Sequence, residues 1–314
     1  MTERWRRGWA WRVDRRLRWG AGAALLLLVL LQVGSGGVLH QLGRANLGIA
    51  LPAIAGLVAV HLLGALTWWL LQARVGGWAP EWSGTLQTYY VAQAIGGMTP
   101  ANLGSDVYRL AAAPPGQRWS VAALPILIQR VGSTAALAAL GAIGLSIISL
   151  RVAAVGWVIG GSVALVAMGI AAAVVLRRRG VARGRGMLRV WVGTAAMALG
   201  LGVAFHSASL LLSLALVASI TPVDDPILVL AALAGARLSL LVPITPSGLG
   251  LQEGLQVILF AGIGLTGDVA LATSLLSRVG LLATTLLGAS LLLGGHSGRM
   301  KPVAGSAGGD PLAG

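Results

Sequence analysis

The sequence contains no cysteine, so disulfide bonds, thiol nucleophiles and thiolate metal ligands are excluded. Its four histidines are widely scattered, and we therefore expect neither a metal centre nor any other cofactor. The metalloprotease helix motif, the nucleophile-elbow serine and the Walker phosphate loop are also missing from the sequence. These absences indicate that the protein is not an enzyme, and we assign no catalytic residue.

Charged residues are scarce as well. Only 10% of the residues are charged and 56% are hydrophobic, whereas about 25% of the residues in soluble domains are charged. So few charges cannot cover the surface of a soluble protein of this size. Several apolar runs reach the length of about 20 residues that a membrane-spanning helix needs. The sequence therefore predicts an integral membrane protein.

The few charges are mostly positive, with a net charge of +14. In a soluble protein this excess would suggest a nucleic-acid partner. Here the arginines cluster within residues 4–18 and 177–189, beside long apolar runs. This placement is typical of the cytoplasmic flanks of membrane spans, and we expect no nucleic-acid partner.

Eight apolar segments follow one another along the chain, and two of them are interrupted. The uninterrupted segments are predicted to be full spans. The interrupted ones, 84–113 and 227–265, each contain Thr-Pro followed by small residues, and proline and glycine both disfavour a continuous helix. We expect two re-entrant helical hairpins, whose irregular tips are tolerated at membrane depth only inside protein or beside a wet cavity. The predicted spans are 20–42, 48–73, 121–149, 152–176, 189–219 and 268–294, and the hairpin-tip residues are Thr99, Pro100, Gly104, Thr245, Pro246, Gly248 and Gly250.

The two halves of the chain, about 20–150 and 151–295, repeat each other. In both, a glycine stands four residues after the proline of the Thr-Pro pair. An Arg-Val-Gly triplet follows in both, beginning 30 residues after the first proline, at Arg130, and 32 after the second, at Arg278. Each half has three full spans and one hairpin, and the odd number of crossings inverts the second half. The sequence therefore predicts an all-α integral membrane protein built as an inverted-repeat bundle of six full spans and two re-entrant helical hairpins.

The basic residues predict the topology. With both termini in the cytoplasm, the cytoplasmic segments hold 18 of the 23 basic residues, as the positive-inside rule requires. We expect a basic cytoplasmic N-terminus at 1–19 and a disordered cytoplasmic tail at 296–314. No small-x-small cleavage site follows the apolar run Leu25–Leu31, so we expect an uncleaved first span. The predicted location is the cytoplasmic (inner) membrane, crossed several times.

Three arginines lie within the predicted membrane segments: Arg130, Arg237 and Arg278. An arginine at the bilayer centre costs roughly 2.5–3.5 kcal/mol on insertion scales, which suggests a partner or a function. A lipid phosphate is one candidate partner, because it matches the guanidinium fork. The second helix of each hairpin would begin near the tip, where free amides also favour an anion.

Two carboxylates, Asp106 and Glu253, follow the hairpin tips closely. Asp106 and Arg109 are three residues apart and can pair on one helix face. Glu253 has no basic neighbour nearby in sequence, so its partner would come from another helix, with Arg237 and Arg278 as candidates. Two plainer alternatives remain: the ion pairs only hold the hairpins in place, and Asp106 only caps a helix. The candidate substrate-binding residues are Arg109, Arg130, Arg237, Arg278, Asp106 and Glu253.

A further group of polar residues, His206, Ser209 and Ser213, shares one face of a predicted span by its spacing. We expect this face to form a polar seam between helices, and the alternative is a proton relay.

The two hairpin motifs carry a resemblance to a known family. The stretch 241–254 contains a proline-and-glycine turn followed by Gly-x-x-Glu, and the stretches 99–109 and 128–132 fit the same family pattern. Over about residues 20–295 the chain resembles the lysylphosphatidylglycerol synthase transmembrane region, also called the flippase-like domain.

The resemblance implies a function in lipid transport. The family includes the membrane half of the multiple peptide resistance factor, which moves aminoacylated phosphatidylglycerol, and other members are linked to polyprenyl-phosphate sugar carriers and hopanoid lipids. The soluble aminoacyl-transferring domain of resistance factors is not found in this sequence, so we expect that the chain does not make such a lipid. Asp106 stands where the resemblance leads us to expect glutamate more often. The family pattern points to Gly250 and Glu253, to Pro100, Gly104, Asp106 and Arg109, and to Arg130 and Arg278.

We therefore expect a flippase or transporter that moves a phosphate-bearing lipid or lipid-linked substrate across the cytoplasmic membrane. Its expected partners are membrane lipids, either anionic or linked to polyprenyl phosphate. One alternative is a lipid-phosphate enzyme similar in layout to undecaprenyl-pyrophosphate phosphatase, but that chemistry needs clustered carboxylates and a Ser-Arg motif, and Ser247 has no arginine beside it. The other is a non-transporting partner of a membrane glycosyltransferase.

Overall fold

The computed structural model describes residues 27–28, 31, 33–76, 78, 80–97, 99, 102–114, 117–149, 185–242, 245 and 247–294. This part of the chain is helical and contains no β-strand. Its elements are α2 (Ser35–Arg44), α3 (Leu47–Ala59), α4 (His61–Val75), α5 (Trp82–Gly97), α6 (Leu103–Ala111), α7 (Trp119–Ser149), α9 (Arg185–Ile220), α10 (Pro226–Arg237), the 3-10 helix η1 (Leu238–Leu241), α11 (Leu251–Gly262) and α12 (Gly267–Leu293).

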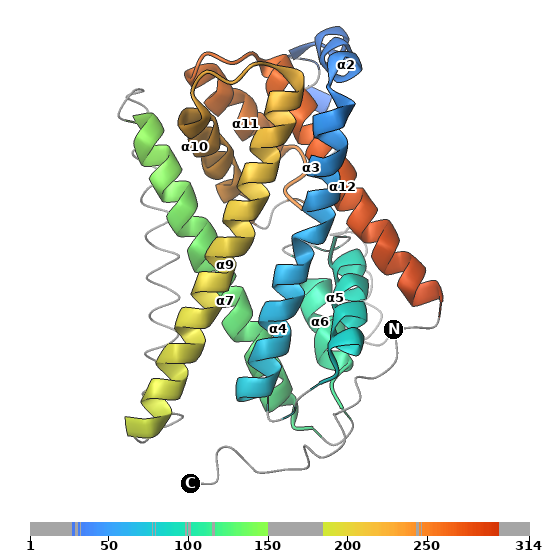
Figure 1. Cartoon of the computed structure of the whole chain (residues 1–314), viewed down its shortest axis with the longest axis vertical. Coiled ribbons are helices and arrows are strands. Elements are labelled where there is room, and N and C mark those ends of the chain that lie inside the picture. The colour runs from blue at the N-terminus through green and yellow to red at the C-terminus, as the bar shows by residue number, and fades with distance from the viewer. Residues whose placement is uncertain are drawn as a thin grey trace, which may run out of the picture.

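Four helical stretches are long and apolar enough to cross a membrane. The first is α3 and α4 joined end to end at Val60, and the others lie in α7, α9 and α12. They agree with four of the six spans predicted from the sequence, and the predicted span 152–176 lies outside the described residues. Figure 1 shows these stretches running along the length of the molecule.

The remaining predicted span, 20–42, is wrong as a continuous helix. The backbone breaks at Gly34, where φ is 94°, a conformation that glycine adopts without steric cost. A separate short helix, α2, begins at the next residue and packs against α12 at one end of the molecule (Figure 1). The stretch is apolar throughout, so its hydropathy does not reveal the helix break. The glycines at 34, 36 and 37 make such a break possible.

Two helical hairpins lie between the long helices. In the first, α5 packs against α6, and in the second, α10 packs against α11. With 16 residues, α5 is about 24 Å long, and the other three are shorter, so none matches the hydrocarbon thickness of about 30 Å. Figure 1 places α5 and α6 at the end of the molecule where α7 begins, and α10 and α11 at the opposite end.

Local chemistry sets where the hairpin helices begin. The carboxylate of Asp225 accepts hydrogen bonds from the first amides of α10, and Pro226 occupies its first turn. The N-terminus of α6 is capped by Thr99, whose Oγ1 accepts from the amide of Gly104 at 2.8 Å. Before α11 the chain turns through Gly250 at a φ of 81°, which favours glycine.

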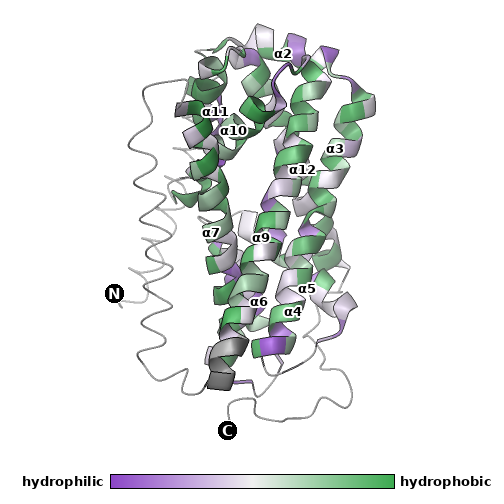
Figure 2. Ribbon diagram, turned by 60° about the vertical axis from the view of Figure 1, so that its left-hand side comes forward, coloured by the Kyte–Doolittle hydropathy of each residue, from purple (hydrophilic) through white to green (hydrophobic). Residues whose placement is uncertain are grey.

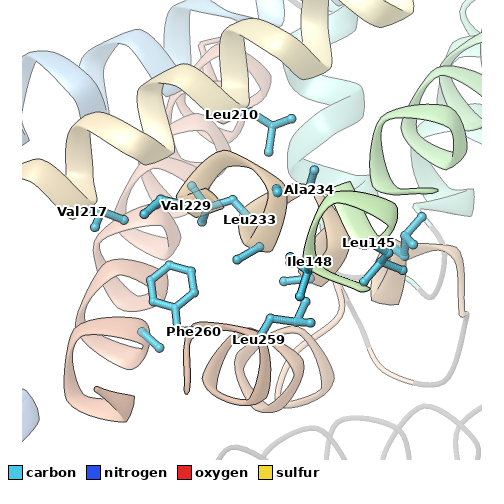
Figure 3. Packing of buried hydrophobic residues seen from close by; sticks show 14 of the residues in the cluster. Leu145, Ile148, Leu210, Val217, Val229, Leu233, Ala234, Leu259 and Phe260 are labelled. Carbon is cyan, nitrogen blue, oxygen red and sulfur yellow. The ribbon is translucent and has the colours of Figure 1, made fainter. Parts of the chain in front are cut away.

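Each hairpin packs into its own cluster of buried hydrophobic residues. The second is enclosed by the cluster in Figure 3, in which Phe260 of α11 and Leu233 of α10 lie with side chains from α7 and α9. The first packs through Tyr89 against Trp68 of α4 and Ile126 of α7. In Figure 2 the long helices carry hydrophobic residues along most of their length and hydrophilic ones mainly near their ends. Large apolar side chains are exposed on their outer faces, as lipid contact requires.

Candidate substrate site

The broken segments of the two hairpins meet inside the molecule. The hydroxyl of Ser247 in the second break donates to the carbonyl oxygen of Gly97 in the first, at 3.3 Å. Asn102 and Ser247 have φ values of 58° and 48°, which are unusual for residues other than glycine. Such backbone conformations persist only where surrounding contacts fix them, and they concentrate at functional sites.

Two cavities lie beside this junction. One of about 300 Å³ lies against the first hairpin, and one of about 520 Å³ extends to the second. Because both are lined by His61, Gln93, Asn102, Arg130, Thr134 and Phe205, they are neighbours on either side of this shared wall. We call the pair the central cavity.

The first hairpin contributes an ion cluster centred on Asp106. Its Oδ1 accepts from Arg109 Nη2 at 2.6 Å, and its Oδ2 pairs with Arg130 of α7. The Cζ atom of Arg109 lies 5.3 Å from the ring centre of Trp68, and Arg109 Nη1 donates to Gln129 Oε1 at 2.6 Å. The pairing of Asp106 with Arg109 is therefore confirmed. Because both oxygens bind arginines while Thr99 caps the helix, the interpretation of Asp106 as only a helix cap is wrong.

The second hairpin contributes a deeper ion pair. Glu253 is 1% exposed, and its Oε1 accepts from Arg278 Nε at 2.8 Å and from Ser274 Oγ at 3.1 Å. Its Oε2 accepts from the amide of Gly250 at 2.7 Å, which holds the start of α11. Arg278 Nη1 donates to the carbonyl oxygen of Ser247 at 2.9 Å, so α12 is tied to the hairpin break. The predicted partner of Glu253 from another helix is confirmed as Arg278.

Arg237 does not contact Glu253, so that candidate pairing is wrong. Its Nη2 instead donates to Ser213 Oγ at 2.8 Å and to the carbonyl oxygen of Ser209 at 3.0 Å, both on α9. The guanidinium lies at the end of α10 and is directed across to α9. Within the described part of the chain, no carboxylate lies within ion-pair distance of it.

The polar seam predicted on α9 is present. In addition to the Arg237 contacts, His206 Nε2 lies 3.0 Å from Ser133 Oγ on α7. Ser133, His206 and Ser209 each line part of the central cavity. The seam therefore continues the polar wall of the cavity between the long helices.

Most of the residues predicted from the sequence gather around the central cavity. Arg109, Arg130, Arg237 and Arg278 line it, as does Asp106, while Glu253 lies behind Arg278. Thr245 and Gly248 also line it, Thr99, Gly104 and Gly250 shape the starts of the hairpin helices, and Pro100 and Pro246 lie outside the described residues. Sequence reasoning missed Gln93, Asn102, Gln129 and Thr134, although polar residues in apolar segments were an available signal.

The charge of the site is positive. Around the central cavity, four arginines face two carboxylates, Asp106 and Glu253. Asp106 is shared between two arginines, Glu253 is paired with one, and Arg237 has only neutral partners in the described chain. An anion entering the cavity would therefore meet uncompensated positive charge.

Comparison with known proteins identifies the family of the chain. The family model for the lysylphosphatidylglycerol synthase TM region matches residues 17–288 of the chain. The chain belongs to this family. Its family membership and its four long apolar helices together make it a multi-pass membrane protein. No curated protein matches the sequence.

Proposed function

We propose that the protein transports a phosphate-bearing lipid, or a lipid-linked substrate, across the cytoplasmic membrane. The phosphate would enter the central cavity while the acyl or prenyl tails stay in the surrounding lipid. Family membership supports a function connected with membrane lipids. The observation that carries the proposal is the junction of two broken hairpins beside a cavity lined by Arg130, Arg237 and Arg278.

The arrangement of the helices supports an inverted-repeat transporter. In Figure 1 the chain descends through α3–α4, rises and returns in the first hairpin, and rises through α7. It then rises through α9, descends and returns in the second hairpin, and descends through α12. Opposite directions in equivalent elements are what two inverted halves require, and transporters of this kind bind substrate where broken helices meet. We place both termini in the cytoplasm because the basic residues concentrate on that side.

The electrostatics favour a phosphate in particular. The guanidinium group offers paired donors that match phosphate oxygens. At an effective dielectric constant of 20, two opposite charges 4 Å apart attract by about 4 kcal/mol. Arg237, which has only neutral partners in the described chain, would contribute attraction of this order, whereas the attraction from Arg130 and Arg278 is reduced by their carboxylate partners. Arg278 is 17% exposed and Arg130 is 34% exposed, so both stay accessible while paired.

The test is transport by the purified protein in liposomes. Tail-labelled phosphatidylglycerol and phosphatidic acid should cross at rates well above those in protein-free vesicles, and a labelled diacylglycerol should show no such acceleration. Equal acceleration of the charged and the neutral lipid would refute a phosphate site. Release of inorganic phosphate from a polyprenyl pyrophosphate under the same conditions would replace the transporter by the enzyme alternative.

A further inference from the structure

A histidine lies halfway along the first long helical stretch. His61 is the first residue of α4 and directly follows the junction with α3 at Val60. In the stretch Leu47–Val75, fourteen residues precede it and fourteen follow it, so at about 1.5 Å per residue it lies about 21 Å from either end. Figure 1 shows α3 and α4 continuing one another along the molecule. His61 therefore lies near the middle of a membrane-spanning stretch.

The ring of His61 is beside the substrate path but is not tied to the protein. The residue lines both parts of the central cavity, on their shared wall. Its Nδ1 atom is buried and has no hydrogen-bond partner within the described chain, whereas most buried polar side-chain atoms have one. His206, which also lines the cavity, differs in this respect, because its Nε2 lies 3.0 Å from Ser133 Oγ. His61 thus keeps a titratable nitrogen that no described protein group binds.

The groups around the ring are aromatic or positively charged. Phe205 of α9 lies 5.6 Å away between ring centres, and Tyr89 and Tyr90 of α5 each lie at 6.3 Å. Asp106 is the one carboxylate that lines the cavity in the described chain, and two arginines already bind it. The titratable and charged residues on the helices packed against α4 or on the cavity wall are Tyr89, Tyr90, Asp106, Arg109, Arg130, His206, Arg237 and Arg278.

These surroundings make a proton on His61 depend on the ligand. In the cavity alone, an imidazolium would add to an excess of positive charge, because four arginines face two carboxylates. A lipid phosphodiester reduces this excess, and a nearby negative charge favours the protonated form of a histidine. The phosphodiester itself stays ionised at neutral pH, so the proton would bind to the protein and not to the ligand.

We propose that His61 binds a proton when the phosphodiester enters the central cavity and releases it when the lipid leaves, so that lipid and proton cross the membrane together. The proton is held by the free electron pair of the imidazole, and no covalent bond of the lipid changes. One phosphodiester charge and one proton cancel, so the coupled step moves no net charge. The pH difference across the membrane, and not its electrical potential, then drives transport. This inference rests on the proposed transport function and adds the coupled ion.

Proton uptake on binding is the first measurement, and it needs no transport. The full-length protein in detergent is titrated calorimetrically at pH 7 with a water-soluble short-chain phosphatidylglycerol, in two buffers of different protonation enthalpy. The difference between the two binding heats gives the number of protons taken up per bound lipid. We expect more than half a proton in the wild-type protein and less than a fifth in His61→Gln. His40→Gln is the matched control and should match wild type, because His40 lies on α2 and lines neither part of the cavity.

Transport under an imposed pH gradient is the second measurement. Proteoliposomes carry tail-labelled phosphatidylglycerol, their membrane potential is clamped at zero, and the gradient is set in either direction. In the wild-type protein and in His40→Gln, the lipid should move from the acidic to the alkaline side at least fivefold faster than in the opposite direction. In His61→Gln this ratio should fall close to one, and where that variant is too slow for a ratio, the calorimetric comparison decides.

Three results would overturn the inference while leaving lipid binding intact. They are binding to the wild-type protein without proton uptake, equal wild-type rates in both gradient directions, and proton uptake that persists in folded His61→Gln but is lost in His206→Gln. The first two need no variant, so they remain decisive even if His61→Gln does not fold. If phosphatidylglycerol neither binds nor crosses faster than in protein-free vesicles, the proposed transport function itself fails, and this inference fails with it.

Discussion

Replacement of Glu253 by glutamine should strongly destabilise the protein. The side chain is fully buried, and it receives an arginine, a serine hydroxyl and a backbone amide. The variant Glu253→Gln keeps the volume but removes the charge, and it directs an amide NH₂ group toward other donors. Breaking a buried ion pair from one side costs about 3–5 kcal/mol. Since Arg278 is itself 17% exposed and can gain some water, we expect a value near the lower end.

The assay is thermal unfolding in detergent, followed by intrinsic tryptophan fluorescence. In chains of 150–250 residues, each kcal/mol of lost stability lowers the melting temperature by about 2–4 °C. The apparent melting temperature of Glu253→Gln should therefore fall by about 5–15 °C. Gln252→Ala is the control, because it alters a half-buried residue of the same helix without touching the ion pair, and its melting temperature should stay close to wild type.

A double variant separates charge from packing. Glu253→Gln combined with Arg278→Gln leaves no unpaired charge, so it should recover part of the loss caused by Glu253→Gln alone. If Glu253→Gln melts within about 2 °C of wild type, the argument that this ion pair fixes the second hairpin is refuted.

Three other predictions concern packing, the first hairpin and topology. Gly288→Leu should cost about 1–3 kcal/mol by overpacking against the backbone of α5, whereas Gly193→Leu, which faces open space, should cost much less in the same melting assay. Asp106→Asn should destabilise less than Glu253→Gln, because this side chain is 18% exposed, and equal melting losses would contradict that ranking. A cysteine introduced by Asp224→Cys should react with an impermeant maleimide in intact cells and one introduced by Arg179→Cys should not, and the reverse pattern would invert the topology.

The sequence predicted that the segments 84–113 and 227–265 are interrupted, and each contains a break between two helices because the breaks have a local cause. Proline and glycine both disfavour a continuous helix, and α6 and α11 begin at Leu103 and Leu251, close to the helix starts that the sequence predicts. The pairing of Asp106 with Arg109 was also predictable, since three residues of separation place both on one helix face.

Contacts between distant segments were less predictable. Arg237 and Arg278 were equivalent partners for Glu253 in sequence, and only the packing of α12 against α11 decides for Arg278. The break at Gly34 was missed because hydropathy over a long window hides a single turn. The neutral cavity residues, such as Gln93 and Asn102, became recognisable only when the two hairpin breaks were seen to meet.

The central claim is that the cavity arginines carry the phosphate of a lipid, and Arg237→Gln tests it most directly. Arg278→Gln is a less specific test, because it leaves the buried carboxylate of Glu253 without its arginine partner. Arg237 contacts only neutral partners in the described chain. Transport of tail-labelled phosphatidylglycerol should fall at least tenfold in Arg237→Gln, with its melting temperature little changed. The control Arg74→Gln, at an exposed helix end, should transport normally. Wild-type transport rates in folded Arg237→Gln would contradict the account.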